Sequence, residues 1–343
     1  NTLNLNSAAT FGTGTTLDIS GATANVDADL NATNGTLTTS NTTSYDVSAG
    51  TLTDNAALSG ADLNVNGSGS VSVTGATLTG TFTQNTSGSV DMGSGALSAA
   101  NIVLTGGVPA NVSGMTASTG YTLDNVSVST VLSGTGGLTV AGNTVTLSGT
   151  NDFTGAVAID AGTLSVADVA NGGVNSPLGA GTGAIGIGSA TAGTLQFTGS
   201  GADSTDRAVT LGAGGGTIDV SNAAGVLTIS GNVTGAALAK TGAGRLNLGG
   251  TLSHTGTTTI TAGQMVLDGA HTGGAGYSVA SGATLLGTGS TASALAVSGN
   301  VAPGGSIGDL TVGDTTFGDG SVLEIEIDNL GNITQWRQNI WGG

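Results

Sequence analysis

Aspartate is the main residue of this sequence that could carry acid–base chemistry. Of the 21 acidic residues, 19 are Asp, and the closest pairs are Asp203 with Asp206 and Asp27 with Asp29. Polysaccharide hydrolases use two carboxyl groups about 5–10 Å apart, so these pairs are the candidates for hydrolysis. Asp is also favoured at tight turns, and close pairs arise by chance when Asp is this frequent. We therefore predict structural carboxylates and a chain that is not an enzyme.

Basic residues are too few for most other chemistry. Polysaccharide lyases need basic side chains to hold an acidic sugar and remove its proton, but the sequence has only Arg207, Lys240, Arg245 and Arg337. A formal net charge of −17 also argues against a nucleic-acid partner, since binding would require neutralisation of phosphates. The absence of cysteine excludes disulfides, thiolate zinc sites and cysteine nucleophiles.

Metal ligation would depend on the two histidines, His254 and His271, which lie seventeen residues apart. A histidine metal site needs a third ligand, and Asp268 is the only obvious one. We predict solvated histidines instead, and no cofactor. Calcium prefers oxygen ligands, and residues 214–220 approximate a secreted calcium-binding repeat without repeating it, so weak calcium association stays open.

Both tryptophans, Trp336 and Trp341, fall in the last eight residues and flank Arg337. Trp contributes strongly to interface energy, while an end of a β-structure also needs a cover over its open strand edge. These three residues are therefore the candidates for an interaction site, which would serve a homo-oligomer or filament, or for a cap. No segment approaches the ~20 apolar residues of a membrane-spanning helix.

Short strands must position all these side chains. Gly occupies 64 positions and aromatic residues only 3%, while pairs such as Leu63/Val65, Leu195/Phe197 and Leu246/Leu248 recur between Gly, Asn and Ser. Alternation of this kind buries one face of a strand, and Gly and Asn suit tight corners. A β-sandwich would need a larger aromatic core. The pattern predicts an all-β fold, a right-handed parallel β-helix with coils of ~20–22 residues.

One internal repeat is visible without gaps. Residues 147–168 match residues 248–269 at Leu147/Leu248, at Thr154-Gly155/Thr255-Gly256 and at Ala161-Gly162/Ala262-Gly263, among other positions. Each copy reads as strand, Thr-Gly corner, strand, Ala-Gly corner and strand. His254 stands where the first copy has Phe153.

These copies resemble the passenger-associated repeat of autotransporters and related secreted bacterial proteins. Residues 240–248, Lys-Thr-Gly-Ala-Gly-Arg-Leu-Asn-Leu, fit the family's first strand, and residues 301–312 and 320–328 resemble later coils of the same proteins. The resemblance covers residues 131–328. Residues 1–130 share the composition but no alignable repeat, and residues 329–343 leave the pattern as a tail.

The resemblance implies a secreted or surface-exposed β-helix that serves as a display scaffold. We expect an extracellular structural or adhesive solenoid of a bacterial cell surface, sheath or matrix fibre, with cell-surface glycans as possible ligands. A carbohydrate-binding or carbohydrate-degrading β-helix is the first alternative. A released autotransporter passenger is the second, because the family's C-terminal translocator is not recognisable in this sequence.

Overall fold

The computed structural model describes residues 44–325 except 55–56, 86 and 305–307, and, within the first 43 residues, the segments 2–5, 7, 9–10, 16–18, 23–26, 30–31 and 36–38. These described residues form 41 strands and no helix. They divide into two compact units, residues 1–155 with 179–181 and residues 156–178 with 182–343.

The first unit contains two larger sheets and two strand pairs. One sheet runs through β1 (Thr2–Leu5), β4 (Thr23–Val26), β7 (Ser44–Val47), β10 (Leu63–Val65), β13 (Thr81–Asn85), β15 (Leu97–Thr105), β16 (Met115–Asp124) and β19 (Gly137–Val140), with β9 (Leu58–Gly60), β12 (Ala76–Leu78) and β18 (Leu132–Ser133) beside them. The other consists of β2 (Ala9–Thr10), β5 (Leu30–Asn31), β8 (Thr51–Thr53), β11 (Ser70–Ser72) and β14 (Ser89–Asp91). The pairs are β3 (Thr16–Asp18) with β6 (Thr36–Thr38) and β17 (Val126–Val128) with β20 (Thr144–Leu147).

The second unit has three stacks of strands and one pair. The first stack comprises β22 (Gly162–Val166), β24 (Gly193–Phe197), β27 (Gly216–Val220), β30 (Leu238–Thr241), β32 (Thr258–Ile260), β35 (Tyr277–Val279), β38 (Leu295–Val297) and β40 (Thr315–Phe317). The second comprises β25 (Ala202–Thr205), β28 (Val226–Ile229), β31 (Arg245–Leu248), β33 (Gln264–Leu267), β36 (Thr284–Gly287), β39 (Asn300–Pro303) and β41 (Val322–Leu323). The third comprises β21 (Val157–Ile159), β23 (Ile185–Ile187), β26 (Val209–Leu211) and β29 (Val233–Gly235), and the pair is β34 (Ala270–His271) with β37 (Ser290–Thr291).

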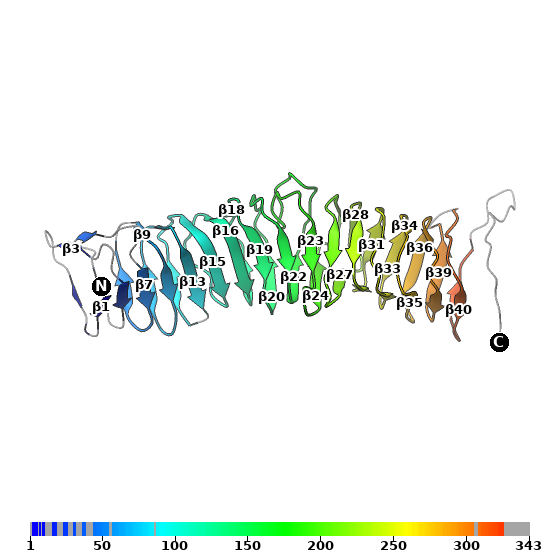
Figure 1. Ribbon diagram of the computed structural model, residues 1–343, viewed down its shortest axis with the longest axis horizontal. Helices are drawn as coiled ribbons and strands as arrows, with labels where there is room; N and C mark the ends of the chain where they lie inside the picture. The colour runs from blue at the N-terminus through cyan, green and yellow to red at the C-terminus, as the bar shows by residue number, and fades with distance from the viewer. Residues whose placement is uncertain are drawn as a thin grey trace. The chain divides into compact units, whose positions relative to one another are not determined.

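In the second unit consecutive strands enter different sheets, and each return adds one parallel rung to the sheet it left, as Figure 1 shows for β31, β33, β36 and β39. Partners Leu238, Thr258, Tyr277 and Leu295 on successive rungs lie 20, 19 and 18 residues apart. Rungs of this kind are about 4.8 Å apart. Each unit is therefore a parallel β-solenoid, which confirms the predicted all-β parallel β-helix; its right-handedness stays a prediction.

The core follows the predicted alternation. In β24 and β27 the side chains of Leu195, Phe197, Ile218 and Val220 are all buried, while the residues between them are only half-buried. The register Leu195↔Ile218 and Phe197↔Val220 stacks these side chains from coil to coil. A core built by stacking needs only one large side chain for each rung, which explains how 3% aromatic residues suffice.

Candidate functional site

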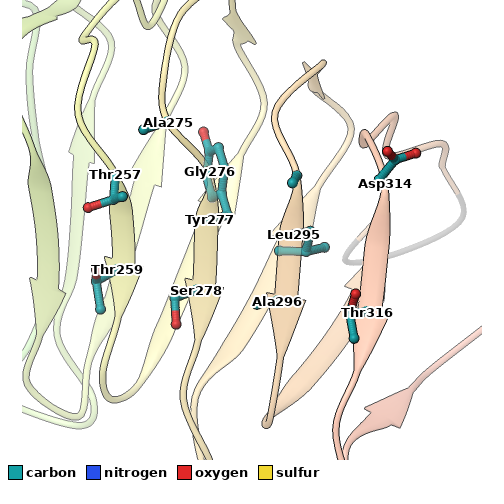
Figure 2. Close-up of a pocket in the computed structure, with 11 residues that line it drawn as sticks. Thr257, Thr259, Ala275, Gly276, Tyr277, Ser278, Leu295, Ala296, Asp314 and Thr316 are labelled. Atoms are coloured by element: carbon teal, nitrogen blue, oxygen red, sulfur yellow. The ribbon is translucent and has the colours of Figure 1, made fainter. Parts of the chain in front are cut away.

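A groove lies on the outer face of the second unit, where β32, β35, β38 and β40 run side by side. Its volume is about 380 Å³. Figure 2 shows side chains from all four strands along it, with Asp314 immediately before β40. The lining residues are Thr257, Thr259, Ala275, Gly276, Tyr277, Ser278, Ala294, Leu295, Ala296, Asp314 and Thr316.

The coil register makes this face hollow because it aligns small residues. Thr259, Ser278, Ala296 and Thr316 are successive register partners. A parallel column of small residues is held by the backbone ladder, in which the amides of Thr258, Tyr277 and Leu295 donate to the carbonyls of Gly276, Ala294 and Asp314 at 2.8–2.9 Å. The side chains of Tyr277 and Leu295 are themselves buried.

A second, shallower hollow of about 190 Å³ shares Thr257 and Thr259 with the groove and extends it toward β27 and β30. Gly214, Gly215 and Gly216 line this hollow. The glycine run of the segment that approximates a calcium-binding repeat therefore forms part of a surface hollow. The nearby carboxylate of Asp219 accepts a hydrogen bond from Thr241 Oγ1 at 2.7 Å. Among the described residues no group of three His, Cys, Asp or Glu side chains could hold a metal ion.

The groove chemistry is that of a binding surface for hydroxyl-bearing ligands. Thr257, Thr259, Ser278 and Thr316 carry hydroxyl groups that both donate and accept hydrogen bonds, and Asp314 adds an exposed carboxylate. None of the lining residues is cationic. A carboxylate pair for hydrolysis is likewise not found among the lining residues, which include one acid.

The aspartates singled out for hydrolysis lie elsewhere. Asp206 accepts a hydrogen bond from the backbone amide of Gly172 at 2.7 Å and thereby holds a long connection between coils. Burial, followed by the charge of Asp168, raises the pKa of Asp203. The pair Asp27 and Asp29 lies outside the described residues.

Other aspartates connect successive coils, as expected for structural carboxylates. Asp62 Oδ1 accepts from the amide of Thr81 at 2.7 Å, and Asp124 Oδ1 accepts from the amide of Asn143 at 2.7 Å. The backbone amide of Gly93 and the side chain of Asn111 lower the pKa of Asp91. These bonds each join residues one coil apart or close a corner, so the carboxylates satisfy backbone donors that lie outside the ladders.

The histidines are not solvated, and that prediction was wrong. His254 is 0% exposed and His271 3% exposed, and their rings stack with centroids 4.2 Å apart. Asp268 does not join them, because its Oδ1 accepts from the amide of Thr288 at 3.1 Å. The strand register buries the histidines: Leu252 bridges to His271 one coil on, and both positions point inward.

A chain of hydrogen bonds connects the two rings. His254 Nε2 lies 2.7 Å from Thr258 Oγ1, Thr258 is hydrogen bonded to Tyr277, and Tyr277 Oη lies 2.8 Å from His271 Nδ1. His271 Nε2 lies 3.1 Å from the backbone oxygen of His254, which closes the chain into a ring. Burial lowers the pKa of His254 to about 4 and also lowers the pKa of His271. We name these four residues the histidine corner.

Two of the rare cations are also interior, which sequence reasoning missed. Lys240 is 0% exposed, and its Nζ donates to the carbonyls of Thr241, Gly242 and Ala262 at 2.6, 2.9 and 3.3 Å. Burial lowers its pKa to about 8. Arg207 is 2% exposed and donates from Nε and Nη1 to the carbonyls of Gly183 and Leu178 at 2.8 and 2.9 Å. The sequence signal for Lys240 is its position two residues after the inward-facing Leu238.

The predicted interaction residues Trp336, Arg337 and Trp341 lie outside the described residues. The homo-oligomer or filament that rests on them stays a prediction. No helix within the described part of the chain is long and apolar enough to cross a membrane.

Comparison with known proteins identifies the repeats. No curated protein and no solved structure matches the chain. A family model described as the passenger-associated-transport-repeat matches residues 142–166 and 238–267. The first match contains β20, β21 and β22, and the second begins with β30 and ends with β33. The chain therefore carries two passenger-associated-transport-repeats, each folded as successive strands of a parallel β-solenoid.

Proposed function

We propose that this chain is the extracellular solenoid of a bacterial surface or matrix protein, with a structural and adhesive role and no enzymatic activity. The observation that carries the proposal is the placement of both passenger-associated-transport-repeats on coils of the solenoid. Proteins with such repeats are typically exported, and a solenoid in which each coil contacts only its neighbours can fold progressively as it emerges.

The proposed role depends on the rigidity of the fold and not on a chemical reaction. Parallel ladders pair the backbone of each coil with the next, and stacked inward side chains exclude water between them. The fold needs no disulfide, because the chain has no cysteine, so its stability does not depend on the redox state outside the cell.

Surface labelling tests this role. In cells that express the complete locus, an antibody against residues 238–267 is expected to label intact cells, or to detect the chain in the medium or matrix. A cytoplasmic marker on the same cells should stay unlabelled until lysis. Detection of the chain only after lysis would contradict the proposal. The gene sequence downstream distinguishes a self-exported passenger from a related secreted protein.

A second candidate function, carbohydrate binding, is favoured by the groove over β32, β35, β38 and β40. Its hydroxyl groups lie on the β32, β35 and β40 rungs, with Ala296 between them on β38. Rungs are about 4.8 Å apart, roughly the length of one pyranose residue in an extended glycan. With Asp314 as the charged lining residue and a net charge of −17, the groove suits a neutral glycan and repels an acidic one.

Filling the groove tests this candidate. Ala296→Trp places a large ring over the exposed centre of the groove and is expected to weaken binding of neutral oligosaccharides, such as cellohexaose, laminarihexaose or maltohexaose, by at least tenfold, since it removes the ligand's contact surface. Thr210→Trp on β26 is the matched control, because Thr210 is equally exposed but does not line the groove. Isothermal titration calorimetry measures the affinity of both variants for each oligosaccharide. Failure of every probe to bind, or equal loss in both variants, would reject the groove as a glycan site.

A further inference from the structure

The histidine corner has one arrangement of protons that satisfies its hydrogen bonds at neutral pH. His271 Nε2 faces a carbonyl oxygen, so it must carry the proton and donate. His271 Nδ1 then accepts from Tyr277, Tyr277 accepts from Thr258, and Thr258 accepts from His254 Nε2. In this arrangement the remaining nitrogen, His254 Nδ1, is a buried acceptor without a partner.

Protonation of either histidine disrupts this arrangement. A protonated His271 donates from both nitrogens, so the Tyr277 and Thr258 hydroxyls must both reverse and His254 must move its proton to Nδ1. Protonation of His254 itself also puts a proton on Nδ1. In both cases a buried N–H without an acceptor results, which costs ≈ 1–3 kcal/mol, and a charge is placed in the dry interior.

Among the described strands around the corner no anion offsets that charge. The elements that pack against the corner are β29, β30, β34, β37 and β38 with β32 and β35 themselves, and within these strands the only charged side chain is the cation Lys240. Asp268, on the segment before His271, is held by Thr288. Tyr277 stays neutral, because burial raises its pKa.

The solenoid does not require polar side chains at this place. In the first repeat the residues equivalent to His254 and Thr258 are Phe153 and Val157, and Ile185 pairs with Val157 as Tyr277 pairs with Thr258. These three apolar side chains are all buried, at 0%, 1% and 0% exposure. The second repeat thus has polar and titratable side chains at positions where the first repeat has buried apolar ones.

From this geometry we infer that the histidine corner is an acid-sensitive latch, which keeps its coils closed at neutral pH and opens them locally when the histidines take up protons. This inference rests on the fold and on the corner, and it is independent of export and of glycan binding. Opening admits water, which supplies the acceptors that the protonated rings lack.

The direction of the pH dependence follows from linkage. The pKa of His254 is lowered from 6.5 to about 4 in the closed state, so between these values the open state binds more protons than the closed one. The closed corner has its full stability above about pH 6.5 and loses it as the pH falls toward 4. At pH 4.5 this one group increases the open fraction on the order of 50-fold.

Hydrogen exchange on the full chain, read by mass spectrometry and corrected for intrinsic rates, tests the inference. On a change from pH 7 to pH 4.5, peptides within residues 252–279 are expected to lose protection by at least tenfold. Peptides within residues 147–166, which hold the apolar equivalents Phe153 and Val157, should keep theirs. The double variant His254→Gln/His271→Gln supplies an amide N–H near each Nε2 without titrating, so it should abolish the selective loss.

Three results would overturn the latch. Protection of residues 252–279 could persist at pH 4.5, protection could fall equally in residues 252–279 and 147–166, or the double glutamine variant could lose protection as the unmodified chain does. The comparison of residues 252–279 with residues 147–166 within the unmodified chain does not depend on whether the variant folds.

Discussion

Lys240→Met is expected to destabilise the second repeat by about 3–5 kcal/mol, because it leaves three half-buried carbonyls without the buried ammonium that they bind. The Lys240 ammonium donates to three carbonyls, those of Thr241, Gly242 and Ala262, and so uses all three of its N–H groups. Methionine fills a similar volume but donates nothing. Each of these half-buried carbonyls costs up to about 3 kcal/mol when it is left without a donor.

Native-state hydrogen exchange over residues 238–267 measures this loss as a decrease in the free energy of local opening, which suits a chain whose coils contact only their neighbours. Arg245→Met is the matched control, because Arg245 lies on the next strand and is only half-buried, with its Nε bonded to Asn247 Oδ1 at 2.8 Å. It should cost less than about 1 kcal/mol. Equal effects of the two variants would show that Lys240 contributes only as a surface cation does.

Tyr121→Phe is expected to destabilise the first unit by about 2–4 kcal/mol although it removes a single oxygen atom. Tyr121 Oη accepts from the amides of Ala117 and Ser133 at 2.9 and 3.1 Å. It also lies 2.8 Å from the oxygen of Met115 and 2.7 Å from that of Ser133, either of which can accept its single proton. Burial raises the pKa of Tyr121 to about 12, so the hydroxyl stays neutral and both amides depend on it.

Hydrogen exchange of residues 115–133 reports the effect of this variant. Phe153→Leu serves as the control, because the Phe153 ring packs against Tyr121 with centroids 6.1 Å apart and carries no polar atom. This replacement removes no hydrogen bond and costs roughly 1–2 kcal/mol through the space that it leaves. If Tyr121→Phe proves no more costly than this control, the hydroxyl is not needed by the two amides.

The parallel β-solenoid could be predicted because its rules are local. Alternation in segments such as Leu195-Gln196-Phe197 indicates which side chains point inward, and that prediction is confirmed by burial. The two repeats could be predicted from residues 147–168 and 248–269 alone, and the family model matches overlapping stretches. Both predictions use only residues that lie close together in the sequence.

The partners of inward polar residues could not be predicted, because they depend on the register between coils. Successive rungs are 20 residues apart at Leu238↔Thr258 but 31 apart at Gly162↔Gly193, since the intervening connection is longer. The spacing of seventeen residues between His254 and His271 is near one coil length and allows the two to stack, but it does not show that their side chains point inward. The groove was missed for the same reason, since its small residues come from four coils that only the register aligns.

The burial of the rare cations also bears on how the chain meets proteases. Trypsin-like enzymes cut after Lys or Arg, and they need several residues on each side in an extended, accessible segment. In the described part of the chain the candidate bonds follow Arg207 and Lys240, which are 2% and 0% exposed, and Arg245, which lies in a strand paired on both sides. Burial and strand pairing thus shield these three bonds, so this portion of the chain is expected to resist trypsin-like enzymes.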